Sequence, residues 1–243
     1  MKSLGRQQEQ RLARFRRLGL ECNPFRVVEA SELAELWLPV TGIEPATLLA
    51  APEPAVQIIA PAGWGKSITL RAIEHVAGQQ ALTTAYLYCP PDKPVRLILP
   101  RPSASLLLLD EADRLGPFGW WRTRRWLARG ARKLVAGTHE DIQPRLRLPV
   151  RTIRLPPCNT HTLAAFIARR IAWAGGDPQR FRFCSSAIER LDQLAGGSLR
   201  QAELICYELF QMIETPPGSA TIGPELVELA HRAAVRNLHQ PTQ

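Results

Sequence analysis

A glycine-rich turn that ends in Gly-Lys-Ser carries the groups that bind phosphate. Residues 60–67 read Ala-Pro-Ala-Gly-Trp-Gly-Lys-Ser, between an apolar run at 56–59 and a segment of helical character at 68–76. Gly63 and Gly65 allow backbone N–H groups to turn inward around an anion, and the dipole of the following helix points its positive end to the same place. The pattern predicts a strand, a phosphate-binding loop and a helix, in this order.

The side chains at the end of this loop offer further contacts to a nucleotide. In this pattern the amine of Lys66 reaches the β- and γ-phosphates, and the hydroxyl of Ser67 binds Mg²⁺. The predicted nucleotide contacts are Ala62, Gly63, Trp64, Gly65, Lys66, Ser67 and Ile68.

The loop departs from G-x-x-x-x-G-K-[ST] at its first position, where Ala60 replaces glycine. Alanine fits there if its φ angle is negative. A positive φ would strain the loop and weaken nucleotide binding, and a protein that binds ATP without hydrolysing it is the corresponding alternative. Taken alone, the motif also permits a chance Gly-Lys-Ser in a turn.

An acidic pair that follows a run of leucines is the second candidate for this chemistry. Four leucines at 106–109 precede Asp110 and Glu111. A continuous apolar run predicts a strand buried on both faces of a parallel sheet, and ligands bind at the carboxyl ends of such strands. We therefore expect Asp110 to hold Mg²⁺ through water, and Glu111 to act as a base or to orient a water molecule. The alternative is a solvated acidic turn, and Asp113 is expected to be a helix N-cap or a solvated acid.

With these residues in this order, the chain resembles the AAA+ ATPase family over about residues 22–210. Residues 60–67 resemble Walker A, and residues 106–111 resemble Walker B. Thr138 ends a predicted strand at the place of sensor 1, and the Gly-Ser-Leu-Arg that ends at Arg200 resembles the G-x-x-R of sensor 2. The resemblance implies that ATP and Mg²⁺ bind, that Thr138 senses the γ-phosphate, and that Arg200 links the nucleotide state to the position of a helical lid.

The resemblance also implies an arginine that completes the ATP site of a neighbouring subunit. The turn Pro144-Arg145-Leu146-Arg147 occupies the region that often carries this residue in the family. The choice between Arg145, Arg147 and neither stays open, because an arginine in a turn between strands is commonly a solvated surface residue. Hydrolysis is then expected to depend on self-assembly into a ring or filament.

The sequence Asn23-Pro24-Phe25 resembles one branch of the family. This branch contains bacterial AAA+ proteins of the general-secretion and transposon-regulator type, which lie near the replication initiators. The alternative is a turn in which Phe25 fills the edge of a core.

The resemblance implies an α/β fold, in which a P-loop NTPase parallel sheet flanked by helices is followed by a small all-helical AAA+ lid. The expected domains are a basic N-terminal segment at 1–22, a nucleotide-binding α/β domain at 23–155 and the helical lid at 156–243. Strands are expected at 56–59, 82–88, 106–109, 133–138 and 150–155. The lid helices are expected at 160–174, 185–195, 199–213 and 224–237.

Two proline-rich stretches interrupt this plan. Residues 39–54 predict a connection into the first strand, and five prolines between Cys89 and Leu106 disfavour a helix there. AAA+ proteins usually have a helix in this second gap, often with loops that line the ring pore or touch DNA. A short edge strand at 95–99 is expected in its place, and the departure argues against a threading mechanism and against a DNA contact from this element.

The composition favours an anionic macromolecular partner. The 243 residues carry a net charge of +9, from 31 Lys and Arg against 22 Asp and Glu, and only four of the basic residues are Lys. This charge favours nucleic acid, although an excess of arginine also arises from GC-rich coding sequences. Five dispersed cysteines without a C-x-x-C pair argue for reduced thiols and against a zinc site or a disulfide framework. Apolar stretches too short to span a membrane and a polar N-terminus predict a cytoplasmic protein with no membrane partner.

A segment rich in tryptophan and arginine follows the acidic pair. Residues 119–133 interleave three Trp with six basic residues. Aromatic rings among arginines suit stacking on bases and contacts to phosphates, which makes candidate nucleic-acid residues of Arg122, Arg124, Arg125 and Arg129. Two alternatives stay open: the Trp rings pack beneath the sheet with arginine stems over them, or the segment is a protein interface within a ring.

The basic N-terminal segment has apolar residues at 12, 15 and 18, which is helical spacing. It is expected to be either an arm for nucleic acid or another partner, or a frayed solvated helix.

Two classes of function compete on this pattern. The first is an AAA+ ATPase that binds and hydrolyses MgATP to control assembly on, or recruitment to, DNA, as transposition regulators or initiators do. The second is an ATP-dependent protein-interaction switch in a secretion, signalling or defence system, with a protein partner and no DNA role. The basic tryptophan-rich segment favours the first class, and the missing pore-loop helix favours the second.

Overall fold

The computed structural model describes residues 12–29, 32–39, 43–91, 104–213 and 221–238. Contacts divide the chain into two compact units. The α/β unit comprises Glu29–Pro156, and the helical unit comprises Pro157–Gln243 together with Met1–Val28. The expected nucleotide-binding domain began at residue 23, whereas the contacts group residues 23–28 with the helical unit.

The α/β unit is built on a five-stranded parallel sheet with the strand order β2-β3-β4-β1-β5. Its strands are β1 (Ala55–Ile59), β2 (Thr84–Tyr88), β3 (Leu106–Asp110), β4 (Lys133–Thr138) and β5 (Val150–Arg154). Each of the five lies within, or one residue outside, a stretch that the sequence predicts as a strand. The predicted parallel α/β fold is confirmed.

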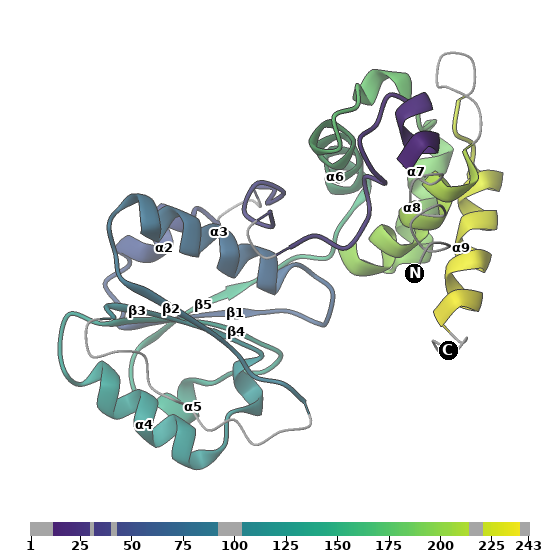
Figure 1. Ribbon diagram of the computed structural model, residues 1–243. Helices are drawn as coiled ribbons and strands as arrows, with labels where there is room; N and C mark the ends of the chain where they lie inside the picture. The colour runs from purple at the N-terminus through teal and green to yellow at the C-terminus, as the bar shows by residue number, and fades with distance from the viewer. Residues whose placement is uncertain (1–11, 30–31, 40–42, 92–103, 214–220, 239–243) are drawn as a thin grey trace, which may run out of the picture. The chain divides into compact units, whose positions relative to one another are not determined.

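Helices cover the two faces of this sheet (Figure 1). On one face lie α2 (Pro45–Ala50) and α3 (Lys66–Gln79), and on the other lie α4 (Pro117–Leu127) and α5 (Gln143–Leu146). A short 3₁₀ helix, η1 (Ala112–Arg114), follows β3. Every residue of β3 is buried, and its leucines alternate between the two core clusters on opposite faces. This explains why the leucine run shows no period of two.

One polar side chain inside the sheet ties the strands to the loop after β4. Gln57 lies fully buried in β1. Its amide nitrogen donates to Asp141 Oδ1 at 2.8 Å and to Thr152 Oγ1 at 2.7 Å, and its carbonyl oxygen accepts from the Ile142 N–H at 2.9 Å. These bonds satisfy the buried amide and fix the start of α5, which follows this loop.

One proline-rich stretch contains a helix, and most of the other lies outside the described residues. The stretch 39–54, predicted as a connection, contains the helix α2, which begins with Pro45 in its first turn. Proline is tolerated there because the N–H groups of a first turn have no partner within the helix. The edge strand expected at 95–99 lies outside the described residues.

The helical unit contains α6 (Thr160–Trp173), α7 (Ser185–Ala195), α8 (Leu199–Met212) and α9 (Pro224–Leu238), with the 3₁₀ helix η2 (Pro178–Arg180) between α6 and α7. These bounds match the predicted helices to within a residue. Side chains of Asn159 and Ser198 cap the first turns of α6 and α8, and Gly196 ends α7 in the left-handed conformation. The predicted helical C-terminal part is confirmed.

Residues 12–28 pack against the helices of this unit. Residues 12–17 are helical, and Phe15 and Leu18 are buried. The guanidinium of Arg14 donates to the Ile213 carbonyl at 3.0 Å. Over its described part, the basic N-terminal segment is therefore a packed element of the helical unit and not a frayed helix. Its role as an arm for nucleic acid or another partner stays a prediction.

The Asn-Pro-Phe sequence has a structural role in the same unit. The Asn23 side chain accepts from the Phe25 N–H at 2.9 Å and donates to the Tyr207 carbonyl at 3.1 Å. Phe25 is buried, with its ring centroid 5.7 Å from that of Phe166 and 5.4 Å from that of Phe210. This packing corresponds to the predicted alternative, in which Phe25 fills a core.

Among the helices of the described ranges, none has both the length and the apolar composition needed to cross a bilayer.

Candidate nucleotide-binding site

The glycine-rich loop joins the carboxyl end of β1 to the first turn of α3. Gly63 and Gly65 have φ angles of 81° and 98°, which a residue with a Cβ atom rarely adopts. The helix begins directly after Gly65, at Lys66, and no side chain caps it. Its first N–H groups are therefore available to an anion.

The alanine at the first position of the loop fits without strain. Four non-glycine residues of the described chain have a positive φ, and Ala60 is not one of them. It is buried, and its N–H donates to the Thr138 carbonyl at 3.2 Å. The negative φ that the replacement of glycine requires is therefore present.

Lys66 places a buried ammonium group inside the loop. Lys66 is 4% exposed, and its Nζ donates to the carbonyls of Ala60 at 2.9 Å and Pro61 at 3.2 Å. Nζ also lies 3.7 Å from Glu111 Oε1. Burial lowers the pKa of Lys66, while the carboxylates of Glu111 and Asp110 oppose this shift. A phosphate group in the loop would stabilise this desolvated cation.

The remaining predicted loop residues differ in exposure. Ala62 and Ser67 are exposed, and Ile68 is partly buried. Trp64 is also partly buried, and its ring packs against the core on the α2 and α3 face. The Ser67 hydroxyl is therefore open to a ligand, whereas Trp64 supports the loop.

Asp110 is held at the carboxyl end of β3 by two hydrogen bonds. It is 3% exposed. Oδ2 accepts from the Tyr86 hydroxyl at 2.8 Å, and Oδ1 accepts from the Glu111 N–H at 3.1 Å. Burial and the Asp110 carboxylate raise the pKa of Tyr86, so Tyr86 remains a donor. Gly137 makes room for this carboxylate, because a Cβ atom there would lie 3.2 Å from Asp110 Oδ1.

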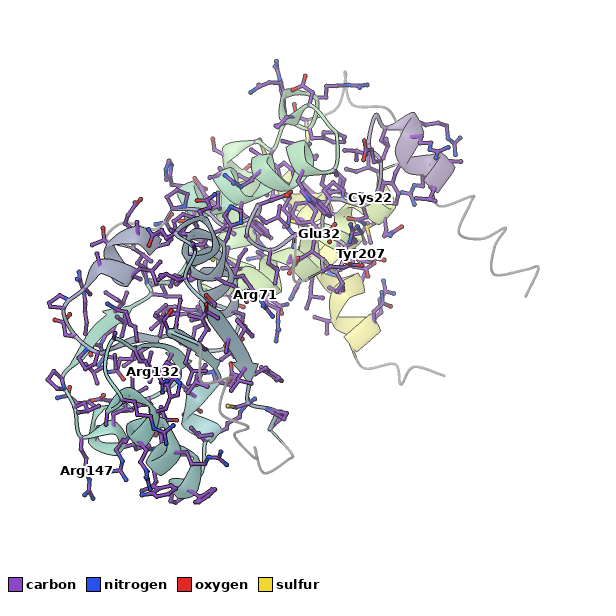
Figure 2. The ribbon with its side chains drawn as sticks, turned by 60° about the vertical axis from the view of Figure 1, so that its left-hand side comes forward. Cys22, Glu32, Arg71, Arg132, Arg147 and Tyr207 are labelled. Atoms are coloured by element: carbon purple, nitrogen blue, oxygen red, sulfur yellow. The ribbon has the colours of Figure 1, made fainter. Side chains whose placement is uncertain are left out.

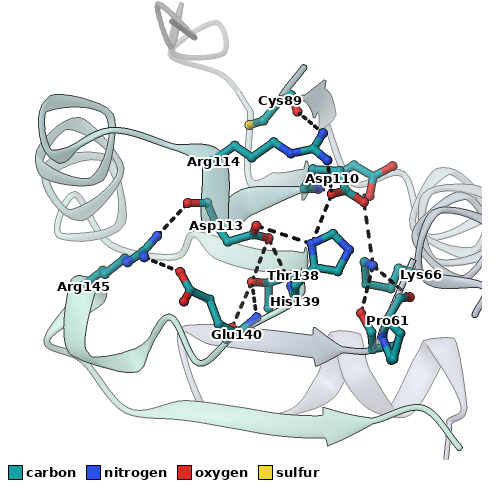
Figure 3. A network of polar contacts seen from close by, with 12 residues as sticks. Pro61, Lys66, Cys89, Asp110, Asp113, Arg114, Thr138, His139, Glu140 and Arg145 are labelled. Atoms are coloured by element: carbon teal, nitrogen blue, oxygen red, sulfur yellow. Dashed lines mark hydrogen bonds and ion pairs between the residues drawn. The ribbon is translucent and has the colours of Figure 1, made fainter. Parts of the chain in front are cut away.

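Glu111 adopts a left-handed backbone conformation with φ of 58°. Such a conformation in a non-glycine residue costs about 1–2 kcal/mol and persists where the surroundings fix it. The Glu111 carboxylate lies 3.1 Å from Arg114 Nη2 and 3.3 Å from His139 Nδ1, in addition to its contact with Lys66. Arg114 also donates to the Cys89 carbonyl at 3.2 Å. The carboxylate thus lies among three basic side chains, and Figure 3 labels these partners, Lys66, Arg114 and His139.

Asp113 joins η1 to the end of β4. Its Oδ1 accepts from the Thr138 hydroxyl at 3.1 Å and from the His139 N–H at 3.0 Å, and its Oδ2 lies 3.4 Å from His139 Nδ1 (Figure 3). Burial alone would raise the pKa of Asp113, but the bonds from His139 outweigh it and lower the pKa. Asp113 is therefore neither the N-cap nor the solvated acid that the sequence predicts.

The two residues at the tip of β4 both contact Asp113, but only one of them reaches Glu111. The Thr138 side chain is fully buried, and its hydroxyl lies within hydrogen-bonding distance of Asp113 and of the Glu140 carbonyl, at 2.9 Å. His139 is more exposed, and its ring reaches Glu111. The predicted sensor residue thus contacts Asp113, and its neighbour contacts the acidic pair.

Sequence reasoning missed Tyr86, Arg114 and His139 as members of this site. For Arg114 a signal exists, because it lies three residues after Glu111 and a helical turn brings such residues together. Tyr86 lies in β2 and His139 directly follows β4, and only the pairing of these strands with β3 brings both residues beside the acidic pair.

The two candidate arginine fingers have different surroundings. Arg145 donates to the Asp113 carbonyl at 2.7 Å and pairs with Glu140, so it is tied to its own subunit. Arg147 ends α5 in the left-handed conformation and is exposed. Within the described chain its guanidinium has no polar partner, and Figure 2 shows the side chain directed away from the ribbon.

None of the contacts described above involves Arg200 or the four candidate nucleic-acid arginines. Arg200 is exposed in the first turn of α8, in the helical unit. Arg125 and Arg129 are exposed, whereas Arg122 and Arg124 are partly buried. Of the three tryptophans, Trp120 and Trp126 are buried beneath the sheet and Trp121 is exposed.

The sequence matches no family model, and the comparison with curated proteins gives no match. Solved structures share the fold at low identity. The Thermotoga maritima RuvB Holliday junction branch migration motor has a TM-score of 0.55 and 16% identity, over 79% of this chain and 65% of the RuvB chain. Domain III of the Thermotoga maritima replication initiation protein DnaA has a TM-score of 0.61 and 12% identity, over 87% of this chain and 100% of that domain. A DNA replication initiation factor has a TM-score of 0.54 and 13% identity.

These similarities show the fold, which is the P-loop NTPase fold of the AAA+ type, with a parallel sheet flanked by helices and a helical C-terminal part. The chain spans less than two thirds of the RuvB chain, at 65%. The branch indicated by Asn-Pro-Phe is not confirmed by them.

Proposed function

We propose that this protein binds and hydrolyses MgATP in the α/β unit and uses this cycle in a process on DNA. One observation carries the ATPase part. The buried ammonium of Lys66 lies in the glycine-rich loop, within ion-pair distance of Glu111 at the end of β3. The glycine-rich loop and the acidic pair thus share one edge of a parallel sheet, where ligands of such folds bind, and this supports the proposal.

The donors at this edge fit a nucleotide triphosphate with Mg²⁺. The N–H groups at the start of α3 and the Lys66 ammonium suit the phosphates. The exposed Ser67 hydroxyl and the Asp110 carboxylate would hold Mg²⁺, which prefers oxygen ligands. Bound there, the ion neutralises charge on the phosphates. The Tyr86 hydrogen bond orients the Asp110 carboxylate for this task.

Glu111 has the chemistry to orient the attacking water and to accept its proton. Arg114 and His139 contact its carboxylate, and the Lys66 ammonium lies within ion-pair distance of it. Thr138, proposed as the γ-phosphate sensor, acts in this arrangement through Asp113 and His139, because its hydroxyl is buried against Asp113. These side-chain contacts thus link the tip of β4 to the proposed base.

Self-assembly completes the proposed site. Arg147 is the better of the two finger candidates, because its exposed guanidinium is available to a neighbouring subunit, whereas Arg145 is bonded within its own. An arginine stabilises charge on the transferred phosphoryl group. Arg200, at the start of α8, is proposed to couple the nucleotide state to the helical unit.

The DNA part of the proposal is supported by charge and by similarity. The chain has a net charge of +9. The structures that share its fold include a Holliday junction branch migration motor and a domain of a replication initiation protein. Control of assembly on DNA, as in initiators or transposition regulators, is the finer form of this proposal. A protein-interaction switch without a DNA role is the competing function.

ATP turnover with and without duplex DNA tests this function. We expect wild-type protein to release phosphate from MgATP at a rate that rises with DNA, and Lys66→Ala to release none in either condition. Arg232→Ala is the control, because Arg232 is an exposed residue of α9 in the helical unit, where it pairs with Glu228. Turnover indifferent to DNA would favour the protein-interaction switch, and turnover retained in Lys66→Ala would refute the site.

A further inference from the structure

The outer face of α4 carries a stacked pair of exposed aromatic rings. Phe118 is 66% exposed and Trp121 is 43% exposed. Their ring centroids lie 5.5 Å apart, with an angle of 22° between the planes. The opposite face of α4 is anchored under the sheet by Trp120 and Trp126, so the outer rings contribute nothing to that core. Aromatic rings exposed together in this way commonly mark a binding surface.

Two arginines extend this surface, which we call the α4 ring pair. The Arg122 guanidinium lies 5.8 Å from the Phe118 ring centroid, and that of Arg125 lies 5.1 Å from the Trp121 ring centroid. Within the described residues neither forms an ion pair with a carboxylate. The sequence contains no Asp or Glu between Asp113 and Glu140, so the positive charge along this face is not offset locally. The partner that fits is therefore an anion with flat apolar faces.

We propose that the α4 ring pair binds single-stranded nucleic acid, with unpaired bases stacking on Phe118 and Trp121 and phosphates contacting Arg122 and Arg125. This inference rests on the proposed role on DNA and specifies its form. In a duplex the base faces are stacked on one another and closed to side chains, so exposed rings gain contacts only with unpaired bases. A guanidinium beside a ring can bind a phosphate through paired N–H donors while it remains over the ring.

Fluorescence anisotropy of a labelled oligo-dT, with a duplex of matching length, tests the surface. We expect wild-type protein to bind oligo-dT more tightly than duplex. The double variant Phe118→Ala/Trp121→Ala should weaken oligo-dT binding by about 10-fold or more, because each stacked base contributes substantially to affinity. Arg122→Gln/Arg125→Gln should also weaken it and should reduce its dependence on salt, because fewer counterions are released.

Conservative and distant variants separate binding from folding. Trp121→Phe keeps a ring and should retain oligo-dT affinity to within about 3-fold, while it removes the quenching of Trp121 fluorescence that stacking produces. Leu229→Ala, which removes an exposed apolar side chain of α9, should leave affinity unchanged. All of these variants should retain the ATP turnover that wild type shows without nucleic acid, since none alters the loop or the acidic pair.

Several outcomes would overturn the inference. They are equal affinity for duplex and oligo-dT, unchanged oligo-dT affinity in Phe118→Ala/Trp121→Ala, and loss of self-association in that variant, which would make the ring pair an interface between copies of this chain. The proposed function fails separately: DNA-stimulated turnover with no role for the ring pair leaves it standing, and absence of ATP turnover removes it whatever the ring pair binds.

Discussion

Glu111→Gln should lower ATP turnover by about 10²–10⁴-fold while the protein still binds MgATP. The amide has nearly the same shape as the carboxylate, but it cannot accept a proton from water. It also loses the negative charge that pairs with Arg114, and the contact with His139 changes. Phosphate release at saturating MgATP measures the first effect, and a fluorescent nucleotide analogue measures binding.

Glu74→Gln is the matched control for this change. It makes the same chemical substitution on α3, where Glu74 pairs only locally with Arg71, three residues earlier. We expect its turnover to equal that of wild type. If Glu111→Gln hydrolysed ATP at the wild-type rate, another group would have to orient the water, and the assignment of the base would be wrong.

Arg147→Ala should reduce turnover by about 10³-fold or more at concentrations where the protein is assembled, because a finger arginine stabilises the charge of the transferred phosphoryl group. Arg145→Ala should cost less, since Arg145 contacts Asp113 and Glu140 of its own subunit. Phosphate release over a range of protein concentrations separates the two variants. Wild-type turnover per subunit should rise with concentration.

Mixing two inactive variants distinguishes a finger from a local defect. Arg147→Ala keeps the base and Glu111→Gln keeps the finger, so a mixed assembly contains some sites with both groups. We expect the mixture to recover part of the wild-type rate. No recovery from the mixture, or full activity of Arg147→Ala at high dilution, would count against a finger at this position.

The elements that carry the site could be predicted because their residue types indicate which positions are buried and which need an unusual backbone conformation. Four consecutive leucines in β3 require apolar surroundings on both faces, and Gly63 and Gly65 stand where the backbone needs positive φ. In the helical unit, the capping residues Asn159 and Ser198 mark the starts of α6 and α8. Each of these signals lies within one element, so no tertiary information is needed to interpret it.

The polar network around the acidic pair could not be predicted, because it depends on contacts between elements. The left-handed backbone at Glu111 turns its side chain to Arg114 and His139. A glutamate at this position does not indicate that conformation, because left-handed backbone is typical of glycine. The tryptophans of α4 pose a related problem. Periodicity groups them into faces, but only the position of the sheet decides that Trp120 is buried and Trp121 is exposed.

Calorimetric titration of MgATP into wild type and Lys66→Ala tests the central claim most directly, because it measures the phosphate site without requiring DNA, assembly or turnover. The claim is that the glycine-rich loop holds a nucleotide through the buried Lys66 ammonium. We predict that wild type binds MgATP and that Lys66→Ala binds it about 10–100-fold more weakly, the loss expected for a charge-assisted hydrogen bond to phosphate. Equal affinities in the two proteins, or no binding by wild type, would contradict the account.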